Sequence, residues 1–244
     1  MQKLLDTSLG NTKVSKTESL AAGVRMASLS LMPDKIICPQ SGSADCFNLC
    51  IKKSGRGRFE NVAQGRQLKT DYWHHDRDGF LTQLKRELAN FEKLCYRTNK
   101  RPVVRLNVLS DIQWEKHGIP QAFPGILAYD YTKQAHRIGK TPENYKLMFS
   151  YSGAAKYQHQ VQRALKTNAP ISVVFTELPT DPNYRFLGRP VIDGDRSDLI
   201  NVNAGPVIIG LRYKNTGASA DTIAESTFVV DPNQPFLNLI ARVA

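Results

Sequence analysis

The chain has 244 residues, 41% of them hydrophobic and 23% charged, which is the composition of a globular protein large enough to bury its own core. Its apolar runs are too short to cross a bilayer and its first residues lack a secretory signal, so we expect a cytoplasmic protein with no membrane partner. The net charge is +11, and residues 1–101 hold 18 basic and 10 acidic residues. Most of the positive surplus therefore belongs to the N-terminal part of the chain, where it could attract phosphate, nucleic acid or an acidic partner, or keep the surface soluble.

The first hundred residues predict an arm, a strand and two helices. Residues 1–23 are polar and rich in Ser and Thr, and we interpret them as an N-terminal arm. Residues 24–31 favour a strand, and a loop rich in cysteine follows it. Two helices are expected next, over residues 58–73 and around 80–95. The second has apolar residues spaced by three and four positions, with Asp76 or Asp78 available to cap its start.

After the second helix the sequence changes to short, continuous apolar runs. The predicted strands cover residues 103–109, 125–128, 146–149, 171–175, 191–192 and 207–211. A further helix is predicted over residues 154–166, with Ser152 as its cap. Apolar strands interleaved with helices are typical of a parallel sheet buried on both faces. We therefore predict a single α/β domain, a partial (β/α)6-type barrel with mainly parallel strands over residues 24–214, with the cysteine loop after the first strand. Residues 215–244 would add a C-terminal extension, a loop and a short helix packed on the barrel.

Three of the four cysteines lie within thirteen positions of the predicted loop. Cys38, Cys46 and Cys50 have the spacing C-x7-C-x3-C. Thiolates gathered on one loop can bind an iron–sulfur cluster or zinc, and three ligands leave one coordination position open, as a catalytic centre requires. The alternative is that these are ordinary buried cysteines without a metal. Cys95 lies on the apolar face of the second helix, so we assign it to the core.

Basic residues follow the cysteine loop directly. Lys52, Lys53, Arg56 and Arg58 come within eight positions of Cys50. Cations at this place could favour the thiolate form of the cysteines, or they could bind phosphate or nucleic acid. The alternative interpretation is an exposed turn that precedes a helix.

Polar side chains also follow several of the predicted strands. Because the carboxyl ends of parallel strands meet at one rim of a sheet, these side chains can form a pocket together. Carboxylates at such a rim can hold hydroxyl groups, ammonium groups or a divalent metal. We therefore consider Asp130, Lys133, Asp193 and Asp195 as candidates for contacting a substrate, although Asp-Gly-Asp is also ordinary turn chemistry.

Three segments together resemble a family of bacteriophage proteins, the gene product 88 family. They are the loop that begins with Cys38-Pro39 and continues through Cys46 and Cys50, the segment Arg-Leu-Asn-Val-Leu-Ser-Asp at residues 105–111, and Tyr131-Thr132-Lys133. The resemblance covers roughly residues 24–214 and implies a phage-encoded protein in the host cytoplasm. It does not itself imply an activity.

The order of a cysteine loop after the first strand, then a helix and further β/α units, is similar to the radical S-adenosylmethionine (radical SAM) superfamily. This similarity implies that the three cysteines hold a [4Fe–4S] cluster and that S-adenosylmethionine binds the remaining iron through its amino and carboxylate groups. By their position it implies four cofactor contacts, namely Ser110, Asp111, Ser152 and Glu177. The chain departs from the usual C-x3-C-x2-C spacing, and no Gly-Gly-Glu follows a strand.

Two classes of function follow. The first is an enzyme that uses the cluster and S-adenosylmethionine on an undetermined substrate, such as a nucleotide or a macromolecule. The alternative is a non-catalytic protein that binds single-stranded nucleic acid, with a structural zinc at the cysteines. The basic surplus and the aromatic residues Phe59, Tyr72 and Trp73 would suit that role. The sequence does not determine the reaction or the oligomeric state.

Overall fold

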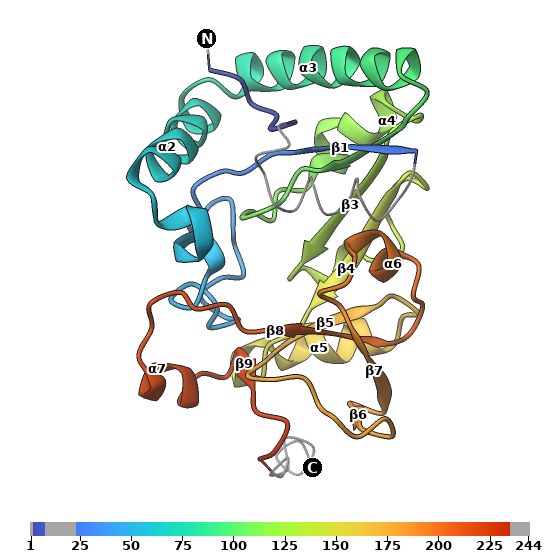
Figure 1. The fold of residues 1–244 in the computed structure, drawn as a ribbon. Helices are drawn as coiled ribbons and strands as arrows, with labels where there is room; N and C mark the ends of the chain where they lie inside the picture. The colour runs from blue at the N-terminus through green and yellow to red at the C-terminus, as the bar shows by residue number, and fades with distance from the viewer. Residues whose placement is uncertain (1, 8–22, 235–244) are drawn as a thin grey trace.

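A mostly parallel β-sheet forms the centre of the molecule in the computed structural model, which describes residues 2–7 and 23–234 (Figure 1). The strands adjoin one another in the order β1-β2-β3-β4-β5-β8-β7-β6, and β9 pairs with β5. Only the β6–β7 pair among these strands is antiparallel. The strands are β1 (Val24–Ser28), β2 (Arg101–Arg105), β3 (Leu127–Thr132), β4 (Tyr145–Ser150), β5 (Ile171–Phe175), β6 (Arg185–Phe186), β7 (Arg189–Asp193), β8 (Ile208–Arg212) and β9 (Val229–Val230).

The helices lie in the connections between these strands. The α-helices are α2 (Glu60–His75), α3 (Arg77–Arg97), α4 (Ile119–Ala122), α5 (Gln158–Leu165), α6 (Asp198–Val202) and α7 (Ala220–Ala224). Short 3₁₀ helices are η1 (Ile51–Lys53), η2 (Gly55–Arg58), η3 (Trp114–His117), η4 (Ala135–Arg137) and η5 (Ala155–Tyr157). None of the helices in residues 2–7 and 23–234 is both long and apolar enough to cross a membrane.

The two long helices α2 and α3 confirm the predicted helices, and for α3 the prediction came from residue spacing. Asp76 caps α3, since its side chain accepts a hydrogen bond of 2.9 Å from the Gly79 amide. The apolar face of α3 is buried against β1 and β2, and Cys95 belongs to that core with no exposed surface. Residues of α5 pack with β4 and β5 in a second core. A third core is formed by side chains of β1, β2, β3, β4 and β8 together with Val202 of α6. The sheet is therefore buried on both faces, as its continuous apolar strands predicted.

The α/β class and the mainly parallel sheet are confirmed, whereas a (β/α)6 barrel is not. Six parallel strands, β1 to β5 followed by β8, stand side by side in chain order. The sheet is open, however, and the helices after β2 and β3 have four residues or fewer in the described chain. Two further strands, β6 and β7, occupy the connection between β5 and β8.

Both ends of the described chain are docked onto the rest of the molecule. Leu4 and Leu5 are buried, and their amides donate to the Glu87 carboxylate of α3 at 2.8–3.0 Å. The other part of the predicted arm, residues 8–22, lies outside the described residues. In the predicted C-terminal extension, α7 is followed by β9, a strand that the sequence analysis missed; it pairs with β5 beyond the point where β4 ends. Residues 235–244 lie outside the described residues.

The prediction that Ser152 caps a helix is wrong. The α-helix begins at Gln158, after the 3₁₀ turn η5, and Tyr157 occupies the N-cap position without a capping side-chain bond. Ser152 is buried instead, and its Oγ accepts a hydrogen bond from the Ala154 amide at 3.2 Å. The serine thus stabilises the turn between β4 and η5, because a short hydroxyl side chain bonds readily to a nearby amide.

Candidate functional site

The carboxyl ends of the parallel strands surround a cavity of about 220 Å³. The cysteine loop follows β1, and residues of β2, β3, β4, β5 and β8 or of the segments that follow them contribute to the wall. Ligand sites of parallel α/β sheets form at this end, because the connecting loops there diverge and leave room for a ligand. The lining includes Cys38, Cys46, Cys50, Arg105, Asn107, Ser110, Asp111, Tyr131, Lys133, Ser150, Ser172 and Asp195.

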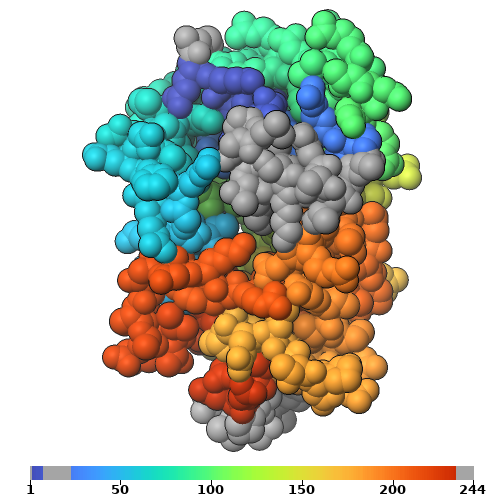
Figure 2. Space-filling view, viewed as in Figure 1, coloured from blue at the N-terminus to red at the C-terminus, as the bar shows by residue number. Residues whose placement is uncertain are grey.

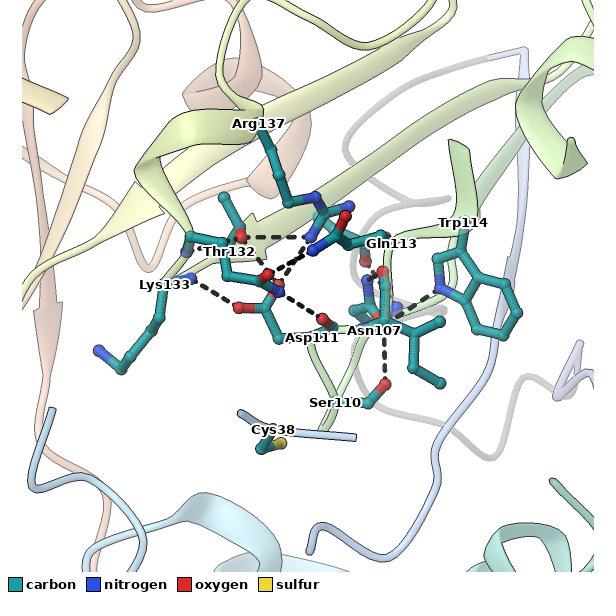
Figure 3. A network of polar contacts seen from close by, with 12 residues as sticks. Cys38, Asn107, Ser110, Asp111, Gln113, Trp114, Thr132, Lys133 and Arg137 are labelled. Carbon is teal, nitrogen blue, oxygen red and sulfur yellow. Dashed lines mark hydrogen bonds and ion pairs between the residues drawn. The ribbon is translucent and has the colours of Figure 1, made fainter. Parts of the chain in front are cut away.

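The cysteine loop is held against the segment that follows β2. The Asp111 amide donates to the Ile37 carbonyl at 2.7 Å, and the Cys38 thiol donates to the Leu109 carbonyl at 3.4 Å. Within the loop, the Asp34 carboxylate accepts hydrogen bonds from the amides of Ile36 and Ile37. These bonds fix Cys38 beside Ser110 and Asp111, and Figure 3 shows the three residues near one another.

The three thiols of this loop face one cavity and influence one another. Burial raises the pKa of each thiol, and the nearby Asp111 carboxylate, followed by Cys50 and Cys46, raises the pKa of Cys38 further. Burial therefore favours the protonated form of all three thiols. Within residues 2–7 and 23–234, no group of three or more His, Cys, Asp or Glu side chains is placed so that it could hold a metal ion.

Asn107 organises the segment that carries Ser110 and Asp111 (Figure 3). Its Oδ1 accepts hydrogen bonds from the Ser110 hydroxyl, the Ile112 amide and the Trp114 indole at 2.8–3.1 Å. Its own amide nitrogen in the backbone donates to the buried Asp130 carboxylate at 2.7 Å. One buried side chain therefore determines the shape of a loop that has no regular secondary structure.

Asp111 is fixed by bonds from two neighbouring segments. Its carboxylate accepts hydrogen bonds from the Thr132 hydroxyl at 2.8 Å, the Lys133 amide at 2.9 Å and the Arg137 guanidinium at 2.7 Å. Arg137 also forms a bidentate pair with Glu115, with both distances 2.8 Å. Because its oxygens already accept these bonds and its charge is paired, Asp111 is a preorganised part of the cavity wall.

Lys133 places a cation next to the thiols. Its Nζ donates to the Ser150 carbonyl and hydroxyl and to the Tyr151 carbonyl at 3.0–3.2 Å, and it lies 4.7 Å from the centre of the Phe228 ring. Burial lowers the pKa of this amine, while the nearby Cys46 opposes that shift. No carboxylate forms an ion pair with Lys133 in the described part of the chain.

A second buried ion pair lies deeper in the cavity wall. The Arg105 guanidinium donates to Asp198 at 3.0 Å and lies 4.7 Å from the centre of the Tyr131 ring. Asp198 also accepts hydrogen bonds from the hydroxyls of Tyr129 and Tyr131. This cluster joins the ends of β2 and β3 to the start of α6.

A family model described as Gene product 88 matches residues 3–231 of the chain. The chain belongs to the Gene product 88 family. The match confirms the family resemblance and extends it beyond residues 24–214 at both ends; a similarity to the radical SAM superfamily is not shown. No curated protein and no solved structure matched the chain.

The predicted site residues of this Gene product 88 chain fall into two groups. The structure brings seven of them to the cavity, namely Cys38, Cys46, Cys50, Ser110, Asp111, Lys133 and Asp195. The remaining predicted residues do not line it. Ser152 and Asp130 are buried outside it, Glu177 is exposed and bonded to Asn233, and Asp193 pairs with Arg212. The basic residues Lys52, Lys53, Arg56 and Arg58 lie on η1 and η2, next to the loop.

Three important residues were not assigned a role from the sequence. Arg105 and Asn107 belong to the segment that carried the Gene product 88 resemblance, so that motif contained a signal for them. Arg137 had no comparable signal, because it lies on a short 3₁₀ helix and reaches Asp111 only through the packing of η4.

Proposed function

We propose that this Gene product 88 protein is an iron–sulfur protein of radical-SAM-like type. Cys38, Cys46 and Cys50 would hold a [4Fe–4S] cluster, and S-adenosylmethionine would bind beside it in the cavity. The observation that carries the proposal is that all three thiols of one loop line one cavity at the carboxyl ends of parallel strands. When bound, the cluster and S-adenosylmethionine would supply one-electron chemistry.

The charges around the cavity suit a group of this kind. A [4Fe–4S] cluster bound by three thiolates is anionic overall, and Lys133 is a partly buried cation without a carboxylate partner in the described residues. A buried cation is stabilised by a nearby counter-charge. Each thiolate of a cluster binds a different iron, so its ligands are spread more widely than those of a single ion. The type of these donors, and the partly buried cation beside them, therefore support the proposal of a cluster in this cavity.

The remaining residues would have supporting roles. Ser110, Asp111, Ser150 and Ser172 present polar groups to the space beside the thiols, where the polar groups of S-adenosylmethionine could bond. The six parallel strands in chain order support the similarity to a partial barrel, whereas the short connections after β2 and β3 depart from it.

The test is anaerobic reconstitution with iron and sulfide, followed by measurement of bound iron, acid-labile sulfide and the visible absorbance spectrum. We expect about four irons and as many sulfides per chain. Cys38→Ala, Cys46→Ala and Cys50→Ala should each abolish stable incorporation. Cys95→Ala is the matched control, because it removes a thiol of the same chain that lies in the α3 core, and it should retain the iron.

Three outcomes would contradict the proposal. Wild-type protein that binds no iron would exclude the cluster, provided that its circular dichroism shows a folded chain. Loss of iron in Cys95→Ala alone would show that the ligands are wrongly assigned. One tightly held zinc per chain, lost equally in the three loop variants, would favour a structural zinc site instead.

A further inference from the structure

Four cations on η1 and η2 form a surface that we call the basic rim, defined as Lys52, Lys53, Arg56 and Arg58. The fourteen residues from Cys46 to Phe59 contain these four cations and no Asp or Glu. Lys53, Arg56 and Arg58 are exposed, and the adjoining Phe59 ring is 60% exposed. Asp45 and the exposed Glu60 flank this segment. An exposed aromatic ring beside several cations is a combination that matches the chemistry of nucleic acid, which offers phosphates and base faces.

The basic rim lies at the edge of the cavity. Ile51, which lines the cavity, directly precedes Lys52, and the Lys52 ammonium lies 3.7 Å from the centre of the Phe47 ring, another lining residue. On the other side, the Arg58 guanidinium donates to the Asn215 carbonyl at 3.3 Å, one residue after the lining residue Lys214. Figure 2 shows the cyan residues of this region directly above the orange residues that follow β8, with a recess beside them. A polymer bound on the rim would therefore pass the entrance of the cavity.

We propose that the basic rim binds the backbone of single-stranded nucleic acid and presents one nucleotide to the cavity. Lys53, Arg56 and Arg58 would contact phosphates, and Phe59 would stack on a base. A single strand fits better than a duplex, because duplex bases are stacked inside the helix and cannot reach a cavity or an aromatic ring without being turned out. The assignment of nucleic acid as substrate rests on the proposed function, whereas binding at the rim does not require a cluster.

The test measures binding of a fluorescent oligothymidylate to the metal-free full-length chain by anisotropy, at several salt concentrations. Affinity should fall as salt rises, because each phosphate contact releases counterions. In the triple variant Lys53→Ala/Arg56→Ala/Arg58→Ala, the slope of log K against log salt should become shallower by about 2, since each contact to a single strand contributes about 0.7. Phe59→Ala should weaken binding roughly tenfold and leave the slope unchanged, because stacking is not ionic.

A second triple variant, Lys85→Ala/Arg86→Ala/Lys93→Ala, is the matched control. It removes three exposed cations from α3 and changes the net charge by the same amount. Affinity should remain near wild type. Equal losses of affinity in the two triple variants would show that binding depends only on the overall charge of the protein, and would overturn the proposal. Tighter binding of a duplex of the same length, or equal competition by heparin, would overturn the assignment to single strands.

The test separates this inference from the proposed function. Failure of the oligonucleotide to bind, in a chain that still takes up iron, would remove nucleic acid as the substrate and leave the cluster in place. Binding with the expected salt dependence, in a chain that takes up no iron, would support the rim and contradict the cluster. Circular dichroism of each variant distinguishes a lost contact from a lost fold.

Discussion

The Arg137 guanidinium donates to the Asp111 carboxylate at 2.7 Å although both side chains are almost completely buried. Arg137 is 2% exposed and Asp111 7%, so solvent does little to stabilise either charge. The same arginine holds Glu115, whose side chain is 14% exposed. One cation therefore compensates the charge of two carboxylates behind the cavity wall. Because Arg137 follows β3 and both carboxylates follow β2, the pairing also joins the segments after these two strands.

Replacing Arg137 should be strongly destabilising. Arg137→Leu leaves Asp111 and Glu115 without their cation, and we expect the free energy of unfolding to fall by about 3–5 kcal/mol. Denaturant unfolding measures this change. Lys140→Leu, which removes an exposed cation of the same turn, should have little effect. Adding Asp111→Asn to Arg137→Leu should recover part of the lost stability, because it removes one of the two uncompensated charges. A further loss of stability in the double variant would contradict the role of Arg137 in compensating Asp111.

Asp130 should make the stability depend on pH. Burial raises the pKa of Asp130 from 3.8 to about 7. Between these values the unfolded chain has released the proton while the folded chain still holds it, so this group makes the protein less stable as pH rises through that window. The contribution of Asp130 to the free energy of unfolding is most favourable below about pH 4 and is lost above about pH 7.

The comparison of wild type with Asp130→Asn isolates this effect. Asparagine keeps an oxygen that can accept the Asn107 amide but carries no titrating proton. The ratio of the two unfolding equilibrium constants should change by up to about tenfold per pH unit inside the window. The variant should become more stable relative to wild type as pH rises. A ratio that is flat from pH 4 to 7 would show that Asp130 has an ordinary pKa.

Removing the Asn107 side chain should disorder the loop that follows β2. Asn107→Ala leaves the buried Trp114 indole and the Ile112 amide without an acceptor, which should cost about 2–4 kcal/mol. Hydrogen exchange at the amides of residues 110–112 should become faster than in wild type. Asn90→Ala on the exposed side of α3 is the control and should change neither measurement.

The four cysteines should differ in their reactivity toward iodoacetamide in the metal-free, folded protein. Cys38, Cys46 and Cys50 line the cavity, so we expect three alkylations by mass spectrometry, and the fourth only after unfolding exposes Cys95. The three reactions should be slow at neutral pH and accelerate as pH rises, because burial raises the thiol pKa values and only the thiolate reacts. Alkylation of Cys95 before any of the other three cysteines would contradict the burial of Cys95 in the core and the position of the three at the cavity.

The sequence by itself determined the elements whose pattern is local. The spacing from Phe80 to Cys95 predicted α3 and its buried face, because side chains three or four positions apart share one side of a helix. Asp76 and Asp78 were both predicted as possible caps, and Asp76 occupies that position. The run Ile171–Phe175 predicted β5 for a similar reason, since a strand buried on both faces is apolar on both sides, and Ser172 is the one polar residue in this run. The clustering of Cys38, Cys46 and Cys50 in the sequence predicted that these three residues lie in one region, and all three line the cavity, because residues of one short loop cannot lie far apart.

Only the tertiary structure decided which strand ends meet at the cavity. Glu177 and Ser110 both follow predicted strands, yet Ser110 faces the cavity and Glu177 bonds to Asn233 on the surface. Neither the short strand β9 nor the contact between Arg137 and Asp111 was predicted from the sequence. A pairing between segments distant in the chain depends on how whole elements pack, and neither residue type nor spacing records that.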